Sequence, residues 1–287
     1  MLGLRALFVL LLPCLFLATE ATGQSGAKPT DSAPLVIGQT FTIVSKAVGE
    51  TRRINVYVPP GYAKSADLRL PVLYMPDGGM AEDFLHVAGL LQVSMGNGTM
   101  RPFLLVGIEN TERRRDLTGP TTNTKDKKIA PRVGGSAAFR QFIRQELMPE
   151  VKRRYRTTSE TAIIGESLAG LFVVETLLLE PDLFDTYLAF DPSLWWNNGQ
   201  LVHDASTLLA GAASKPKTLY LATSNEPEIV ADTKRLAQTL TSKAPRNLTW
   251  HYEAMPQETH GTIYHPAALK AFRMAFKLQA TTSPSIN

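Results

Sequence analysis

Short apolar runs alternate with longer segments of helical periodicity, and this alternation constrains the fold of the chain more than any other feature. Residues 71–75 (PVLYM) and 103–108 (FLLVGI) are continuously apolar, as strands buried on both faces of a sheet are. Residues 136–155 have apolar side chains that recur at helical spacing. We therefore expect a mostly parallel sheet with helices on both faces.

The other predicted elements continue this alternation. Residues 41–45 and 53–58 are β-branched and alternating, which predicts an opening antiparallel pair. Further strands are predicted at 161–164, 186–190, 217–223 and 248–254, and further helices at 168–179, 229–240 and 266–278. Residues 37–280 are therefore predicted to form a single α/β domain, preceded by a Gly-, Ser-, Thr- and Pro-rich leader at 24–36.

Residues 1–23 have the pattern of a secretory signal peptide. A basic start containing Arg5 precedes an apolar run at 6–18, and small residues follow. The run is about 13 residues long, shorter than the ~20 that a membrane span needs, although a retained membrane anchor is the alternative. We expect the chain to be exported, periplasmic or secreted, without stable membrane insertion after cleavage. Because Cys14 is the single cysteine, the mature chain would have no thiol for catalysis or metal binding.

The charge pattern argues against a nucleic-acid partner. The net charge is only +4, and the basic clusters are not interleaved with aromatic residues. The cluster at 152–154 is typical of the solvated end of a helix, where positive charge is favoured.

A serine lies where the strand predicted at 161–164 meets the helix predicted at 168–179. In the segment GESLA, Gly165 and Ala169 lie two residues before and after Ser167. A sharp strand-to-helix turn that exposes a nucleophilic serine needs small residues at these two positions, because they approach each other closely. Alanine replaces the more usual glycine at the second. The alternative is a plain turn with Ser167 as a helix cap.

A serine nucleophile needs a base to accept its proton, and the chain offers five histidines. His260 lies in a loop between the last predicted strand and the last predicted helix. It therefore follows the serine in the chain, which is where the base lies when a serine nucleophile occupies a sharp strand-to-helix turn. His265, at the start of that helix, is the competitor. The acid is expected after the strand at 217–223, where we favour Glu226 over Glu228, which is alternatively a first-turn helix charge.

Two backbone regions could stabilise an oxyanion. One is the N–H group of Leu168, directly after the serine. The other is the loop PDGGM, which follows the strand at 71–75 and offers the N–H group of Gly79 or Met80. A simple Asp-Gly turn is the alternative for this loop.

Several segments together resemble one esterase family. They are PVLYMPDGG, VGIENTERRRDLTGP, the long segment from FIRQELMPE to GESLAGLF, PSLWWNNGQL and HGTIYHPAAL. The family includes esterase D, the antigen 85 mycolyltransferases and the enterobactin and salmochelin trilactone esterases, and the last branch is the most similar. The resemblance implies an α/β-hydrolase fold and hydrolysis of carboxylic esters without a cofactor or metal. It places the nucleophile at Ser167 and the base at His260, and leaves the acid poorly defined.

The same resemblance suggests residues for substrate binding. Arg113 and Arg115 lie in the family's RxRD segment and could reach an anionic or catecholate substrate; the alternative is an internal Arg–Asp pair. Trp195 and Trp196 could line an aromatic acyl pocket, although core packing is the more ordinary role. The expected partner is thus a small-molecule ester. An acyltransferase, a peptidase and a noncatalytic binding protein of the same fold are the alternatives.

Overall fold

The computed structural model describes residues 33–211 and 213–278. The proposed signal peptide, and Cys14 with it, lies outside the described residues, as does most of the proposed leader. Residues 33–36 are exposed and have no regular structure. From Ile37 onward the described residues form one compact unit.

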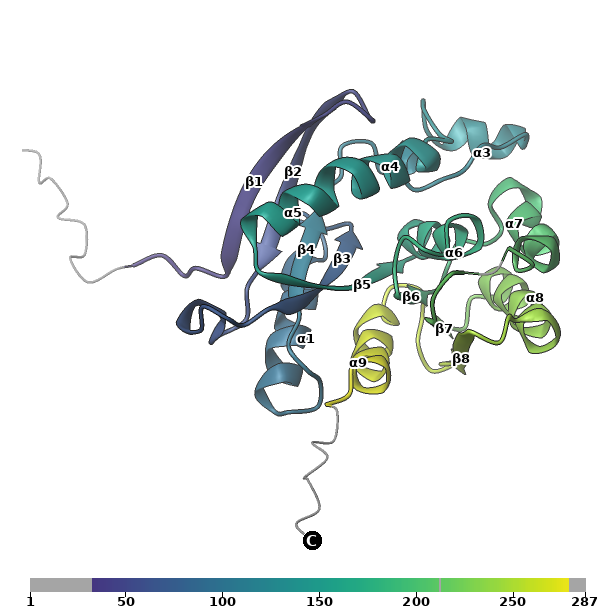
Figure 1. Cartoon of the computed structure of the whole chain (residues 1–287). Helices are drawn as coiled ribbons and strands as arrows, with labels where there is room; N and C mark the ends of the chain where they lie inside the picture. Colours follow the sequence, from purple (N-terminus) through teal and green to yellow (C-terminus); the bar gives the residue numbers. More distant parts are fainter. Residues whose placement is uncertain (1–32, 212, 279–287) are drawn as a thin grey trace, which may run out of the picture. The chain divides into compact units, whose positions relative to one another are not determined.

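An eight-stranded sheet forms the centre of this unit, with the strand order β1-β2-β4-β3-β5-β6-β7-β8 (Figure 1). Its strands are β1 (Gly38–Ser45), β2 (Glu50–Tyr57), β3 (Leu70–Pro76), β4 (Leu104–Ile108), β5 (Thr157–Glu166), β6 (Thr186–Phe190), β7 (Lys217–Thr223) and β8 (Leu248–Ala254). β2 is antiparallel to β1 and β4, and β3 to β8 run parallel. The predicted α/β fold and its opening antiparallel pair are confirmed.

Helices cover both faces of the sheet. They are α1 (Phe84–Gly96), α2 (Arg113–Asp116), α3 (Thr124–Ile129), α4 (Ser136–Phe142), α5 (Met148–Arg154), α6 (Leu168–Leu179), α7 (Trp196–Leu208), α8 (Pro227–Lys243) and α9 (Tyr264–Ala275). α1 and α9 lie side by side on one face, and α4 to α8 contribute to the core on the other (Figure 1). Successive residues of a strand enter different cores, so Leu73 and Met75 pack toward α1 while Val72 and Tyr74 pack toward α6.

The helix predicted at 136–155 has a π-helical turn in its middle, Ile143–Leu147, between α4 and α5. Pro149 lies just after this turn. A proline lacks an N–H group and its ring clashes with the carbonyl four residues earlier, so a regular α-helix cannot pass through it without strain. The wider turn before Pro149 lets the helix continue to Arg154.

Among residues 33–211 and 213–278, no helix combines the length and the apolar character required to cross a bilayer.

Candidate active site

Ser167 lies at a strained turn between β5 and α6. Its backbone has φ 61° and ψ −121°, a conformation that a non-glycine residue rarely adopts. The two small residues of the motif make the turn possible, because a Cβ atom on Gly165 would lie only 2.6 Å from the carbonyl carbon of Ala169. The turn exposes the serine hydroxyl at the carboxyl ends of the parallel strands, where active sites of open α/β sheets form.

His260 reaches this serine from the loop after β8. Its Nε2 lies 3.1 Å from Ser167 Oγ, within hydrogen-bonding distance. His265, the competing candidate, is exposed, and its Nδ1 lies 3.1 Å from Nε2 of His86 on α1. The structure thus brings together Ser167 and His260.

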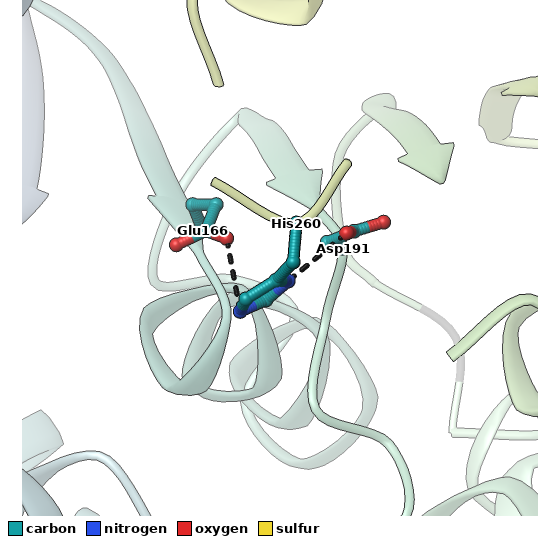
Figure 2. Close-up of side chains that lie close together, drawn as sticks. All are labelled: Glu166, Asp191 and His260. Atoms are coloured by element: carbon teal, nitrogen blue, oxygen red, sulfur yellow. Dashed lines mark hydrogen bonds and ion pairs between the residues drawn. The ribbon is translucent and has the colours of Figure 1, made fainter. Parts of the chain in front are cut away.

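The carboxylate beside Nδ1 of His260 belongs to Asp191, which follows β6. Asp191 Oδ2 lies 3.0 Å from Nδ1, and the side chain is completely buried (Figure 2). Ser224 fixes this carboxylate, because its backbone N–H donates to Oδ1 at 2.6 Å and its hydroxyl donates to Oδ2 at 2.5 Å. Asp191 adopts a positive φ of 40°, so the chain turns sharply as it leaves the sheet.

The expectation that Glu226 is the acid is therefore corrected. Glu226 is exposed, and its backbone N–H donates to the Ser224 hydroxyl at 3.3 Å, while no hydrogen bond in the described part of the chain joins its carboxylate to His260. Glu228 is also exposed and lies in the first turn of α8. The strand ends of β6 and β7 are adjacent, so the carboxylate comes from one strand earlier than expected.

Asp191 was not among the residues predicted to contact the histidine, because the prediction relied on the position of Glu226 after the strand at 217–223. Asp191 directly follows the apolar run TYLAF, at the same edge of the sheet as Ser167. A carboxylate immediately after a buried strand was the signal that could have identified it.

A second carboxylate, that of Glu166, faces the other edge of the imidazole ring. Its Oε1 lies 3.3 Å from Nε2 of His260, so the ring lies between two carboxylates (Figure 2). Burial raises the pKa of Glu166 to about 7, although the charges of His260 and Arg113 act in the opposite direction. The pKa of His260 is raised by its hydrogen bond to Asp191, against the effect of burial, and the charge of Glu166 raises it further.

These three groups could offer a metal ion one ligand atom each within 4.8 Å. A metal ion bound to Nε2 would lie in the plane of the imidazole, about 2 Å beyond that nitrogen and away from Nδ1. Asp191 lies at the Nδ1 edge and so could not share this ion. The arrangement is better matched to a proton on His260 than to a metal ion.

Of the backbone N–H groups expected to stabilise an oxyanion, only some are free to donate a hydrogen bond. The N–H of Gly79 already donates to Oε2 of Glu82 at 2.6 Å, and the N–H of Gly78 donates to the carbonyl of Ile108. The N–H groups of Leu168 and Met80 have no acceptor among the hydrogen bonds of the described residues. Of the two donors expected from the glycine loop, Met80 is thus the one that remains free.

The two arginines predicted to bind substrate occupy different environments. Arg115 is mostly buried and pairs with Glu50 at 2.6 Å and with Asp116 at 2.7 Å, so it is the internal Arg–Asp pair that the sequence left as the alternative. Arg113 makes two hydrogen bonds to Asp77, at 2.6 and 2.8 Å, and retains 35% of its side-chain exposure. Its charge acts on Glu166, so Arg113 lies near that side chain.

The two tryptophans also differ. Trp196 is buried, and its indole N–H donates to the carbonyl of Gly119 at 2.9 Å, so it has a packing role. Trp195 is only partly buried and packs against the same core. Only Trp195 could contribute to the wall of an acyl pocket.

The family profile described as "Putative esterase" matches residues 45–275. The chain belongs to this esterase family. It is 33% identical, over 185 residues, to the ferri-bacillibactin esterase of Bacillus subtilis; the match covers 58% of this chain and 63% of that protein. It is also 36% identical over 203 residues to the siderophore triacetylfusarinine C esterase of Aspergillus fumigatus, covering 64% of this chain and 65% of the relative. The matched segments thus span less than two thirds of the length of either relative.

A solved structure supports the same fold. The chain is similar to an IroE-like serine hydrolase from Shewanella oneidensis, with a TM-score of 0.76 and 30% sequence identity. The match covers 83% of this chain and 80% of that protein. The resemblance to the esterase family and the α/β-hydrolase fold expected from the sequence are both confirmed.

Proposed function

We propose that this chain is a serine hydrolase of carboxylic esters that acts through an acyl-enzyme on Ser167. The observation that carries the proposal is the continuous line of contacts from Ser167 through His260 to the buried Asp191, at a strained turn. A nucleophile, a base and a group that orients the base are the three parts that this chemistry requires.

Each part has a defined task in the proposed reaction. Nε2 of His260 accepts the Ser167 hydroxyl proton as the oxygen attacks the ester carbonyl carbon. Asp191 accepts a hydrogen bond from Nδ1–H, which keeps Nε2 unprotonated in the free enzyme and stabilises the imidazolium that forms. The N–H groups of Leu168 and Met80 are the proposed donors to the oxyanion. The imidazolium then protonates the leaving alcohol, and water releases the acid from Ser167.

Siderophore-type lactones are the substrates we propose to examine first, followed by other aryl and alkyl esters. The support comes from the relatives, whose names describe esterases of ferri-bacillibactin and triacetylfusarinine C. Arg113 is partly exposed beside Glu166 and could contact an anionic group of such a substrate, and Trp195 could contact an aromatic one. No nucleic acid, cofactor or metal is part of the proposed reaction.

Hydrolysis of p-nitrophenyl butyrate by the purified mature chain tests this proposal. We expect Ser167→Ala and His260→Ala to lose at least about a hundredfold in kcat/KM, because each removes a group that acts as part of one unit. Wild-type rates in Ser167→Ala would refute the assignment. Product analysis with an added alcohol would identify an acyltransferase, in which that alcohol replaces water, and a parallel peptide substrate would identify a peptidase. An inactive wild-type chain would favour a noncatalytic binding protein.

We also propose that residues 1–23 direct export and are removed. The support is the order of basic, apolar and small residues in this segment. N-terminal sequencing of the exported chain should find a start near Gln24. Recovery of a membrane-bound chain that still begins at Met1 would instead favour the retained anchor.

A further inference from the structure

Glu166 is a partly buried carboxylate that directly precedes the proposed nucleophile and contacts the proposed base. Its side chain is 17% exposed, and Oε1 lies 3.3 Å from Nε2 of His260, the same nitrogen that faces Ser167 Oγ at 3.1 Å. Within the described part of the chain, this Oε1 is buried and has no hydrogen-bond partner. A buried carboxylate oxygen without a partner is costly, so it needs an explanation.

Arg113, the arginine whose charge acts on Glu166, forms no ion pair with it among the described residues. Arg113 donates two hydrogen bonds to Asp77 and affects Glu166 only through its charge. The titratable groups that face Glu166 from the surrounding elements are Arg113 on α2, Asp77 after β3, Asp191 after β6, His260 after β8 and Tyr264 on α9. Within this set His260 is the group whose charge changes in the proposed reaction.

We infer that Glu166 is a positioning residue whose negative charge stabilises the imidazolium of His260 during acyl transfer. This inference rests on the proposed function, because it requires His260 to accept the Ser167 proton. The contact becomes stronger when Nε2 carries a proton, and a contact that is stronger in the transition state than in the ground state accelerates the reaction. Glu166 transfers no proton in this step. The proton moves from Ser167 Oγ to Nε2, and Glu166 provides the opposing charge.

Glu166 and His260 form a coupled pair that shares one proton. The proton can lie on Nε2 beside a carboxylate, where it prevents Nε2 from accepting the serine proton, or on Glu166 beside a neutral imidazole, where it removes the negative charge that would stabilise the imidazolium. The burial of Glu166 and its contact with His260 both increase the affinity of the pair for this proton. The acid limb of the kcat/KM profile reports on the free enzyme. It therefore reflects protonation of the Glu166–His260 pair and not of His260 alone.

Glu166→Gln tests the inference, because it keeps the shape of the side chain and removes its charge. We expect the acid limb of the kcat/KM profile to move to lower pH, since the pair loses affinity for the blocking proton. The plateau rate should fall about tenfold, because the imidazolium loses an opposing charge at close range. A purely structural role would lower the plateau without moving the limb. Glu226→Gln is the matched control, since this exposed carboxylate also raises the pKa of His260 but forms no ion pair with it among the described residues. It should give a smaller shift in the same direction.

Arg113→Gln provides a second measurement with the opposite sign. Removing this cation leaves Glu166 and Asp77 less neutralised, so the acid limb should move to higher pH. Unchanged acid limbs in both Glu166→Gln and Arg113→Gln, with melting temperatures near that of wild type, would overturn the inference. Ser167→Ala separates this failure from failure of the proposed function, because it is inactive if the serine mechanism holds, whatever Glu166 does. If Glu166→Gln does not fold, the inference is judged on the acid limb of Arg113→Gln alone, and an unchanged limb in that variant would overturn it.

Discussion

Replacing Asp191 by asparagine tests the group that the structure places at Nδ1 of His260. In the folded chain the carboxylate accepts the N–H and the hydroxyl of Ser224 and faces Nδ1 at 3.0 Å. Asparagine has one oxygen and one NH₂ group. If its oxygen keeps the hydrogen bond from the Ser224 N–H, the NH₂ group faces Nδ1. The imidazole must then carry its proton on Nε2, where it cannot accept the proton of Ser167.

The size of the effect follows from this wrong tautomer. Loss of the acid in a serine triad lowers kcat by about 10⁴-fold. Here Glu166 still faces the ring at Nε2, so we expect Asp191→Asn to lose between about 10² and 10⁴ in kcat, or about 3–5 kcal/mol of transition-state stabilisation. The assay is the pH profile of p-nitrophenyl butyrate hydrolysis, with the melting temperature as a folding check. A loss below about threefold in Asp191→Asn, together with a large loss in Glu226→Gln, would refute the reasoning and restore Glu226 as the acid.

Two further substitutions test the scaffold around the site. Gly165→Ala should destabilise the chain by about 1–3 kcal/mol and lower kcat/KM, because the new methyl group would lie 2.6 Å from the backbone of the turn. Gly89→Ala, whose methyl group meets nothing within 4 Å inside α1, should leave kcat/KM unchanged and raise stability by up to about 1 kcal/mol, because alanine is the better helix former. Asp116→Ala should lower the free energy of unfolding by about 3 kcal/mol, because Arg52 is completely buried and pairs with Asp116 at 2.5 Å. Glu150→Ala removes the exposed ion pair with Arg153 and should lower the free energy of unfolding by about 1 kcal/mol or less. Urea titration measures both values, and equal losses in Asp116→Ala and Glu150→Ala would contradict this account.

Much of the sheet could be predicted from the sequence because buried parallel strands are apolar along their whole length. The runs at 186–190 and 217–223 coincide with β6 and β7, which are buried along almost their whole length, and the helix at 168–179 coincides with α6. α1 had no counterpart among the predicted elements, although its buried residues recur at helical spacing. It contains Gly89 and ends at Gly96, and glycine is a poor helix former, so its local signal is weak.

The proposed nucleophile and base could be located in the sequence for a different reason. Ser167 lies between two small residues at a strand-to-helix junction, and His260 lies in the loop between the last strand and the last helix. Both signals are local, so each could be read without knowing which strands are neighbours.

The proposed acid depends on tertiary structure. Asp191 and Glu226 each follow a predicted strand, and although Asp191 does so directly, the sequence does not show which carboxylate is buried beside the imidazole. Only the register of β6 beside β7 brings Ser224 to Asp191 and buries the carboxylate under the imidazole. The hydrogen bond from Gly79 to Glu82 likewise depends on how the loop folds back on itself, so the sequence could not exclude Gly79 as an oxyanion donor.

Covalent labelling of the purified chain with a fluorophosphonate tests the central claim most directly. The reagent forms a stable bond with a serine that is activated by a base, and peptide mass mapping identifies the modified residue. We expect one adduct per chain, on Ser167, much slower labelling in His260→Ala and no labelling in Ser167→Ala. An adduct on another residue, or equal labelling of wild type and Ser167→Ala, would contradict the assignment of Ser167 as the nucleophile.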